Sequence, residues 1–182
     1  MRNRLVQTSR FLSYVLRHSP QALGLDLDPG GWADVDALLE RAWAEGHSID
    51  RVLLEQVTAH GEKERFSLSA DGTKIRASHG HSGDVDLDLT PTIPPKPLYH
   101  GTACTTLSVL RDDGLCPKSR QHVHLSDTRE ETVRVGSRHG TPVVLIVDAQ
   151  GLDEAGRALH RTTDATWLTD RVPTSFLHFP GD

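Results

Sequence analysis

Residues 65–78 read RFSLSADGTKIRAS, and this stretch decides the fold of the first half of the chain. Apolar and polar residues alternate on both sides of the dipeptide Asp71-Gly72, a strong short-range signal for a tight turn between antiparallel strands. The stretch therefore predicts a β-hairpin. The segments before it show which kind of domain the hairpin belongs to.

The first of these segments, residues 4–18, predicts an amphipathic helix. Leu5, Leu12 and Val15-Leu16 recur on one helix face, and the pattern ends at Ser19-Pro20. Residues 1–25 contain four arginines and no acidic residue, so the helix is locally basic. Because the whole chain carries a net charge of −5, any contact with nucleic acid is expected to be local and directed at one site.

Two further helices are predicted between the first helix and the hairpin. The stretch 28–46, DPGGWADVDALLERAWAEG, predicts a Gly-Gly turn and then a helix that Asp34 caps and Gly46 closes. Ser48 is expected to cap a third helix over residues 49–59. Three helices followed by a hairpin match a winged-helix arrangement, a module often used on nucleic acids. Such an analogy of fold does not establish function.

The chain changes character at residues 84–97, DVDLDLTPTIPPKP, which predict an extended segment running into a stiff linker. We therefore expect a first domain over residues 1–90, a proline-rich linker over 91–97 and a second domain over 98–182. The second domain mixes helices and strands, so the predicted class is α+β. Its strands are expected at LYHGT, HVHLS, PVVLIVD, ATWLT and SFLHF, and its helices at TTLSVLRDDG and DTREETVRVG, the latter capped and with acidic residues in its first turn.

Composition sets the broad class of the protein. The 182 residues are 36% hydrophobic, no apolar run reaches membrane-spanning length, and residues 1–25 lack the continuous apolar region typical of a secretory signal. A cytoplasmic monomer is the default expectation, with Cys104 and Cys116 as reduced thiols. Neither a GxGxxG motif after a strand nor a GxxxxGK[ST] motif is present, which disfavours Rossmann and P-loop nucleotide binding.

Arginines and a histidine are the candidate catalytic groups. Arg17-His18 lie in LSYVLRHSP, Arg65 in KERFSLS and Arg120 in RQHVHLS. Such side chains donate charge-assisted hydrogen bonds to phosphate oxygens, and together they would stabilise a phosphate as it is transferred. Each also has an ordinary explanation: Arg17-His18 at a helix C-terminus, Arg65 on a strand edge and Arg120 in a solvated loop.

The histidine-rich stretches leave two further interpretations open. His122 and His124 would share one face of a strand, which is metal-ligand spacing, and with Cys104 and Cys116 a zinc site is conceivable. The stretch SHGHS at residues 78–82 could instead bind phosphate or a nucleotide.

Nine motifs follow one another along the chain: FLSYVLRHSP, GWADVDALL, KERFSL, IRASHGHS, LYHGT, RQHVHLS, VGSRHG, PVVLIVDA and TWLTDRVP. Taken together, they resemble the RNA 2′-phosphotransferase family (tRNA 2′-phosphotransferase, KptA type) over residues 4–180. The family usually has N-Q-G-H-S where this chain has SHGHS.

The resemblance implies NAD⁺-dependent removal of an internal RNA 2′-phosphate of the tRNA splice-junction type, through a phospho-ADP-ribosylated RNA intermediate. NAD⁺ is consumed as a co-substrate, and no metal is required. The first lobe would be winged-helix-like and would bind RNA. The second would be an ADP-ribosyltransferase-like lobe of small sheets with helices. The implied catalytic residues are Arg17, His18, Arg65 and Arg120, the NAD⁺-binding residues His100, Gly101, Thr102, Ser126 and Arg138, and the RNA-binding residues Arg76, His81 and Ser82.

Three alternatives remain at this point. The first is NAD⁺-dependent ADP-ribosylation of a terminal phosphate on RNA or DNA, which would use the same NAD⁺ site. The second is a non-enzymatic winged-helix nucleic-acid-binding protein. The third is a metal-dependent RNA phosphoesterase built on the His122–His124 pair.

Overall fold

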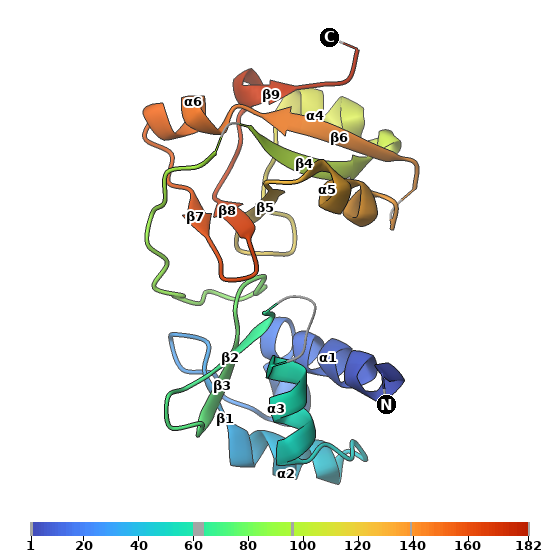
Figure 1. Ribbon diagram of the computed structural model, residues 1–182, viewed down its shortest axis with the longest axis vertical. Coiled ribbons are helices and arrows are strands. Elements are labelled where there is room, and N and C mark those ends of the chain that lie inside the picture. The colour runs from blue at the N-terminus through green and yellow to red at the C-terminus, as the bar shows by residue number, and fades with distance from the viewer. Residues whose placement is uncertain (1, 60–63, 96, 139, 182) are drawn as a thin grey trace. The chain divides into compact units, whose positions relative to one another are not determined.

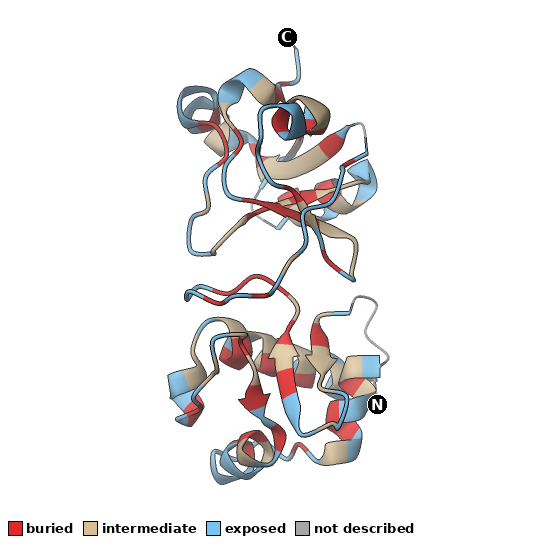
Figure 2. Ribbon diagram, turned by 90° about the vertical axis from the view of Figure 1, so that its left-hand side faces the viewer, coloured by how far each residue is buried: buried red, intermediate tan, exposed pale blue. Residues whose placement is uncertain are grey.

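The computed structural model describes residues 2–59, 64–95, 97–138 and 140–181. Parts of three quoted motifs, at Lys63, Lys96 and His139, lie outside these ranges. The chain forms two compact units, Met1–Asp88 and Leu89–Asp182, each with its own buried core (Figures 1 and 2). Both units combine helices with antiparallel strands, which confirms the α+β class. Among the described helices none is long and apolar enough to cross a membrane.

The first unit packs three helices against a three-stranded antiparallel sheet. The hairpin forms at the predicted place, with Phe66 opposite Ala77 and Leu68 opposite Ile75. The strand order is β1-β3-β2. The elements are α1 (Arg2–Arg17), β1 (Ala33–Asp34), α2 (Val35–Ala44), α3 (Arg51–Ala59), β2 (Phe66–Leu68) and β3 (Lys74–Ala77), with a 3-10 turn at Pro20–Leu23.

The helix caps show where local sequence decides structure. Asp34 caps α2 as predicted, because its Oδ1 accepts a hydrogen bond from the Ala37 amide at 2.8 Å. The predicted cap of α3 at Ser48 is wrong. The Asp50 carboxylate accepts from the Leu53 amide at 2.7 Å, so α3 begins at Arg51. An aspartate directly before the helix reaches the third amide of the first turn, and Ser48 lies two residues too early to do so.

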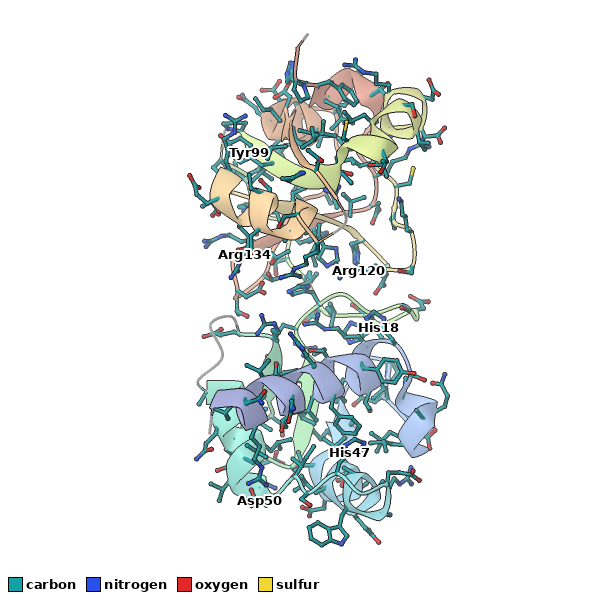
Figure 3. All side chains as sticks on the ribbon, turned by 90° about the vertical axis from the view of Figure 1, so that its right-hand side faces the viewer. His18, His47, Asp50, Tyr99, Arg120 and Arg134 are labelled. Atoms are coloured by element: carbon teal, nitrogen blue, oxygen red, sulfur yellow. The ribbon has the colours of Figure 1, made fainter. Side chains whose placement is uncertain are left out.

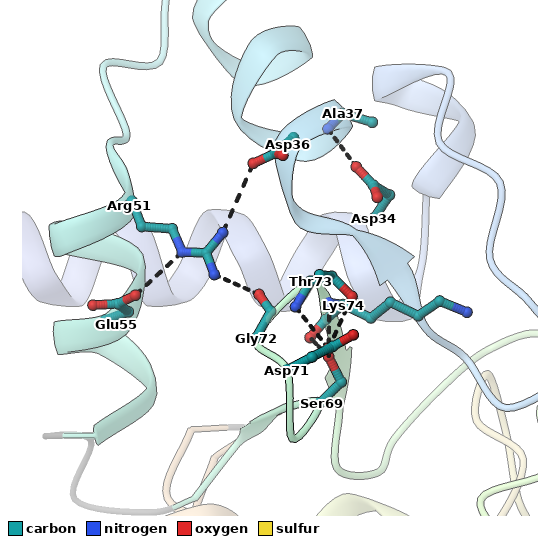
Figure 4. Close-up of polar contacts among 10 residues, drawn as sticks. All are labelled: Asp34, Asp36, Ala37, Arg51, Glu55, Ser69, Asp71, Gly72, Thr73 and Lys74. Carbon is teal, nitrogen blue, oxygen red and sulfur yellow. Dashed lines mark hydrogen bonds and ion pairs between the residues drawn. The ribbon is translucent and has the colours of Figure 1, made fainter.

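Arg51 ties α3 to the rest of the first unit. Its Nη2 donates to the Gly72 carbonyl at 2.6 Å and its Nε to Glu55 Oε1 at 3.1 Å, while Asp36 lies 3.7 Å from Nη1 (Figure 4). The first contact joins the helix to the turn of the β2–β3 hairpin. One guanidinium therefore fixes the hairpin relative to α2 and α3.

The second unit is built on a six-stranded antiparallel sheet of order β7-β8-β5-β4-β6-β9. Leu98, Leu145 and Trp167 lie in its core. Every strand predicted for this half is present. The elements are β4 (Leu98–Ala103), α4 (Leu107–Asp113), β5 (Val123–Ser126), α5 (Arg129–Gly136), β6 (Pro142–Val147), α6 (Ala149–Glu154), β7 (His160–Arg161), β8 (Thr166–Thr169) and β9 (Leu177–His178), with 3-10 turns at Cys104–Thr106 and Thr174–Phe176.

The two halves of this sheet meet at a single pair of residues. Strands β4 and β6 pair at six positions, from Leu98 opposite Val147 to Ala103 opposite Pro142. In contrast, β4 and β5 pair only where Tyr99 faces Ser126. The sheet is therefore split between β7-β8-β5 on one side and β4-β6-β9 on the other.

Three features of the second unit differ from the sequence-based expectation. The predicted linker begins as part of the unit, because Pro91 forms a bridge with His160 and the Thr92 amide donates to the Leu159 carbonyl at 2.7 Å. Helix α5 has the expected acidic first turn, but its N-cap residue Thr128 makes no side-chain capping bond. Short elements α6 and β7 were not predicted, since six and two residues are too few to show a period.

Two glycines let α5 pack directly on β4. A Cβ atom at Gly101 would lie 2.0 Å from the Thr132 carbonyl oxygen, and one at Gly136 would lie 2.8 Å from the Thr102 carbonyl oxygen. Both neighbours are backbone atoms, which cannot turn aside as a side chain can. The glycine in LYHGT is thus explained by packing within the unit.

We predict that Gly101→Ala destabilises the second unit by about 3 kcal/mol or more, because overpacking against fixed backbone forces the helix away from the strand. Thermal unfolding followed by circular dichroism measures this change. Gly83→Ala is the matched control, since a Cβ atom at Gly83 meets nothing within 4 Å. Equal melting temperatures for the two variants would contradict the packing role of Gly101.

Candidate functional site

The candidate site of the first unit lies where α1 ends. Ser19 precedes Pro20, which disfavours helical backbone at Ser19 and removes the next amide, so the helix stops at Arg17. The last carbonyls of a helix lack intrahelical partners. The carbonyl of Arg17 accepts a hydrogen bond from the Ser82 amide at 2.9 Å, which attaches the 78–82 segment to the end of α1.

The Ser82 side chain makes a second contact with the same helix end. Its Oγ lies 2.7 Å from Nδ1 of His18, the residue directly after α1 (Figure 3 labels His18). A hydroxyl can donate to a neutral imidazole nitrogen or accept from a protonated one. Ser82 therefore orients the His18 ring in either protonation state. No local pattern predicts this pairing, because the two residues are 64 positions apart in the sequence.

Arg65 joins the group through its backbone. Its carbonyl accepts from the Ser78 amide at 2.9 Å and from Nη2 of Arg17 at 3.5 Å. The structure thus brings together three of the four predicted catalytic residues, Arg17, His18 and Arg65. They share one place with Ser82, at the junction of α1, β2 and the segment after β3.

A buried histidine lies beside this cluster. Burial, the charge of Arg17 and then the neighbouring His79, His18 and Arg76 lower the pKa of His81 to about 4. The ring is 1% exposed, and neither ring nitrogen has a hydrogen-bond partner among the residues that the structure describes. The direct RNA contact expected of His81 stays a prediction, and in this structure the residue is enclosed beside the cluster.

Arg76 is held by two contacts of its own. Its Nη1 donates to the Gly30 carbonyl at 3.3 Å, and its guanidinium carbon lies 4.5 Å from the centroid of the Trp32 ring. Because the charge of Arg76 acts on His81, it adds to the positive potential at this end of the unit. The site therefore concentrates cationic groups and suits a polyanion.

In the second unit, His100 lies at the split in the sheet. Its Nδ1 donates to the carbonyl of His124 on β5 at 3.0 Å. Burial lowers the pKa of His100, the bond to His124 opposes this, and the charge of Lys118 lowers the pKa further. The ring is therefore neutral near pH 7, its proton is on Nδ1, and Nε2 is a hydrogen-bond acceptor.

The other residues predicted for the second unit fall into two groups. Thr102 Oγ1 lies 2.6 Å from Thr106 Oγ1, and Ser126 Oγ accepts from the Thr128 amide at 3.2 Å, so both hydroxyls make local contacts. Desolvation and then the charge of Arg138 lower the pKa of Arg120, so these two guanidinium groups are near each other.

Lys118 is a basic residue that sequence reasoning missed. Its charge acts on His100, as described above, which makes it a further cation near the split. It lies two residues before Arg120, in an irregular segment where no period marks a side chain. Only the fold shows which way such a residue is directed.

The His122–His124 pair does not build a metal centre in the described part of the chain. There, no three side chains of His, Cys, Asp or Glu gather closely enough to hold an ion. His124 Nδ1 instead donates to the carbonyl of His122 at 3.0 Å. Cys104 and Cys116 are both free and exposed.

Comparison with known proteins identifies the family. The profile described as RNA 2′-phosphotransferase, Tpt1 / KptA family, matches residues 3–171. The chain belongs to this family. It is 50% identical over 177 residues to the probable RNA 2′-phosphotransferase of Pseudomonas aeruginosa PAO1, with 97% of each chain covered. The protein of the same name from Agrobacterium fabrum is 50% identical, over 96% of this chain and 94% of its own length. The one from Acaryochloris marina is 44% identical, over 97% of each chain.

Membership in the Tpt1 / KptA family extends over both units. The matched residues 3–171 contain Arg17, His18 and Arg65 of the first unit and Arg120 of the second. The resemblance drawn from short motifs is therefore confirmed over nearly the whole chain.

We predict that His81 makes this family member sensitive to acid. The pKa of the His81 ring is about 4 in the folded protein and 6.5 in the unfolded chain. At a pH between these two values, the unfolded chain therefore binds a proton at His81 that the folded protein does not bind. The contribution of His81 to the free energy of unfolding is fully present above pH 6.5. It is lost as the pH falls to about 4, and this loss is roughly 3 kcal/mol at most.

Urea unfolding at several pH values, for wild type and His81→Gln, measures this effect. The difference in unfolding free energy between the two proteins should change between pH 7 and pH 4, because the variant lacks the titrating ring. Comparing the two proteins at each pH cancels the contribution of all other titrating groups. Curves that run parallel over the whole range would show that the ring does not titrate as described.

Proposed function

We propose that this protein removes a 2′-phosphate from RNA and uses NAD⁺ as a consumed co-substrate. Family membership and the printed names of its relatives support the RNA 2′-phosphotransferase activity. The observation that carries the proposal is the cluster of Arg17, His18 and Arg65, in which Ser82 contacts Arg17 and His18 and the Arg65 carbonyl contacts the Arg17 side chain. Such a group matches a dianionic phosphate in charge and hydrogen-bonding capacity.

In the first proposed step, a 2′-phosphate oxygen attacks C1″ of the nicotinamide ribose. The bond from C1″ to the nicotinamide nitrogen breaks, and nicotinamide leaves with the bonding electrons. A phosphomonoester carries about −1.5 to −2 charges at pH 7, so the nucleophile needs no general base. The contribution of the arginines is therefore to position the phosphate relative to the ribose.

In the second proposed step, the ribose O2″ attacks phosphorus and loses its proton, and the bond from phosphorus to the RNA 2′-oxygen breaks. The products are ADP-ribose 1″,2″-cyclic phosphate and RNA with a 2′-hydroxyl, whose oxygen must gain a proton. His18 is the proposed donor, because Ser82 fixes its ring beside the arginines. The guanidinium groups of Arg17, Arg65 and Arg120 would stabilise the phosphoryl oxygens.

The proposed folds of the two units agree with this division of labour. The order helix, strand, helix, helix and hairpin, with sheet order β1-β3-β2, supports a winged helix for the RNA-binding unit. The split between β4 and β5 supports an ADP-ribosyltransferase-like unit that binds NAD⁺ there. His100 Nε2 could accept a hydrogen bond from a ribose hydroxyl, and Arg138 and Lys118 would offset the charge of the pyrophosphate.

The direct test uses a short RNA with one internal 2′-phosphate, with NAD⁺ and EDTA present. We predict that the wild-type protein converts this RNA to 2′-hydroxyl RNA and that the conversion requires NAD⁺. The variant Arg120→Ala should lose about 10²- to 10³-fold in kcat, as expected for removal of one charged hydrogen-bond donor. Arg134→Ala is the control, because that arginine is paired with Glu131 at 2.6 Å on α5. Stable ADP-ribosylated RNA from the wild type would favour modification of terminal phosphates instead, and a lack of reaction would favour a binding protein.

His18→Ala should separate the two steps. We predict that phospho-ADP-ribosylated RNA accumulates, because the first step needs no proton donor and the second does. Denaturing gel electrophoresis resolves this species as a band that migrates more slowly than the substrate. If only unmodified substrate remains, His18 acts in the first step or in binding, and the role assigned to it is wrong.

A further inference from the structure

One face of α1 leads directly to the candidate site. Asn3, Gln7, Arg10, Tyr14 and Arg17 follow one another at steps of three or four residues, so they form a single stripe along the helix. All are exposed except the half-buried Arg17. The opposite face, with Leu12, Val15 and Leu16, is fully buried in the core of the unit. The stripe ends at Arg17-His18.

The stripe combines positive charge with an exposed aromatic ring. The Tyr14 side chain is 54% exposed. Arg10 makes no ion pair with any residue that the structure describes, and the first acidic residue of the chain is Asp26. Aromatic rings interleaved with cations are the pattern that binds single-stranded nucleic acid, because every base has a face that stacks and every nucleotide brings a phosphate.

The alternative surface of this unit is α3, the helix that a winged helix usually places against nucleic acid. Its nine residues, RVLLEQVTA, include one basic residue, Arg51. That guanidinium is already in contact with Glu55, Asp36 and the Gly72 carbonyl (Figure 4). Binding a phosphate there would require breaking the contacts that fix the hairpin, so α3 is poorly suited to RNA.

We propose that the RNA next to the 2′-phosphorylated nucleotide runs along the exposed stripe of α1, with a base stacked on Tyr14 and a phosphate at Arg10. The proposal rests on the proposed function, which places the 2′-phosphate at Arg17-His18. Tyr14 lies one helical turn from this pair, and Arg10 lies about 10 Å along the helix from Arg17. The stripe is thus within reach of neighbouring nucleotides on the same strand.

RNA binding without NAD⁺ tests the stripe independently of catalysis. The measurement is fluorescence anisotropy with a labelled single-stranded oligoribonucleotide of mixed sequence. Tyr14→Ala should weaken binding by about tenfold, which is typical for loss of one base stack. Arg10→Gln should reduce the slope of log affinity against log salt by about 0.7, the value for one phosphate contact on a single strand.

Two control variants match the changes in chemistry but lie off the stripe. Trp43→Ala removes an aromatic side chain on α2 that is 68% exposed. Arg4→Gln removes an exposed charge from another face of α1, where Nη2 donates to the Ser48 carbonyl at 2.7 Å. Both controls should bind RNA as the wild type does. If they weaken binding as much as the stripe variants, or if the stripe variants bind normally, the stripe is only a solvated helix face.

A second measurement separates this proposal from the proposed function. The ratio of kcat/KM for a long 2′-phosphorylated oligonucleotide to that for a 2′-phosphorylated dinucleotide should fall about tenfold in Tyr14→Ala. An unchanged ratio would overturn the stripe while the phosphotransferase activity stands. If the wild type turns over neither substrate but binds RNA in a Tyr14-dependent way, the proposed function fails and the stripe is supported.

Discussion

The candidate site depends on one hydrogen bond at the end of a helix. Helix α1 stops before Pro20, and its terminal carbonyl at Arg17 would lack a partner without the amide of Ser82. That bond fixes the 78–82 segment, and the segment in turn orients His18 through the Ser82 hydroxyl and holds the Arg65 carbonyl through the Ser78 amide. Three candidate catalytic residues, from distant parts of the sequence, are thereby brought together by hydrogen bonds to backbone groups and to one hydroxyl.

Gathering cations has a cost that the protein must offset. Burial first, and then the positive charges of Arg17 and its neighbours, lower the pKa of His81. Keeping His81 neutral lets its ring fill the space beneath the arginines without adding charge. A bound phosphate dianion would relieve the repulsion among the remaining groups. The same reasoning applies in the second unit, where Arg138 lowers the pKa of Arg120.

Local signals allowed much of the fold to be predicted. The Asp71-Gly72 turn, the Asp34 cap and the helix stop at Ser19-Pro20 each depend on a few adjacent residues, and the structure confirms them. What could not be predicted depends on contacts between distant residues. The Ser82–His18 pair, the position of Lys118 beside His100 and the single pairing of β4 with β5 have no local sequence pattern. The motifs could still indicate the family, because they record such contacts indirectly.

We propose that the RNA 2′-phosphate is transferred to a ribose from NAD⁺ and is not hydrolysed. The most direct test is to label the 2′-phosphate with ³²P, incubate the RNA with the protein and NAD⁺, and identify the small labelled product by chromatography. We expect the label in ADP-ribose 1″,2″-cyclic phosphate, in an amount equal to the nicotinamide released. Label recovered as inorganic phosphate, or released without NAD⁺, would contradict it.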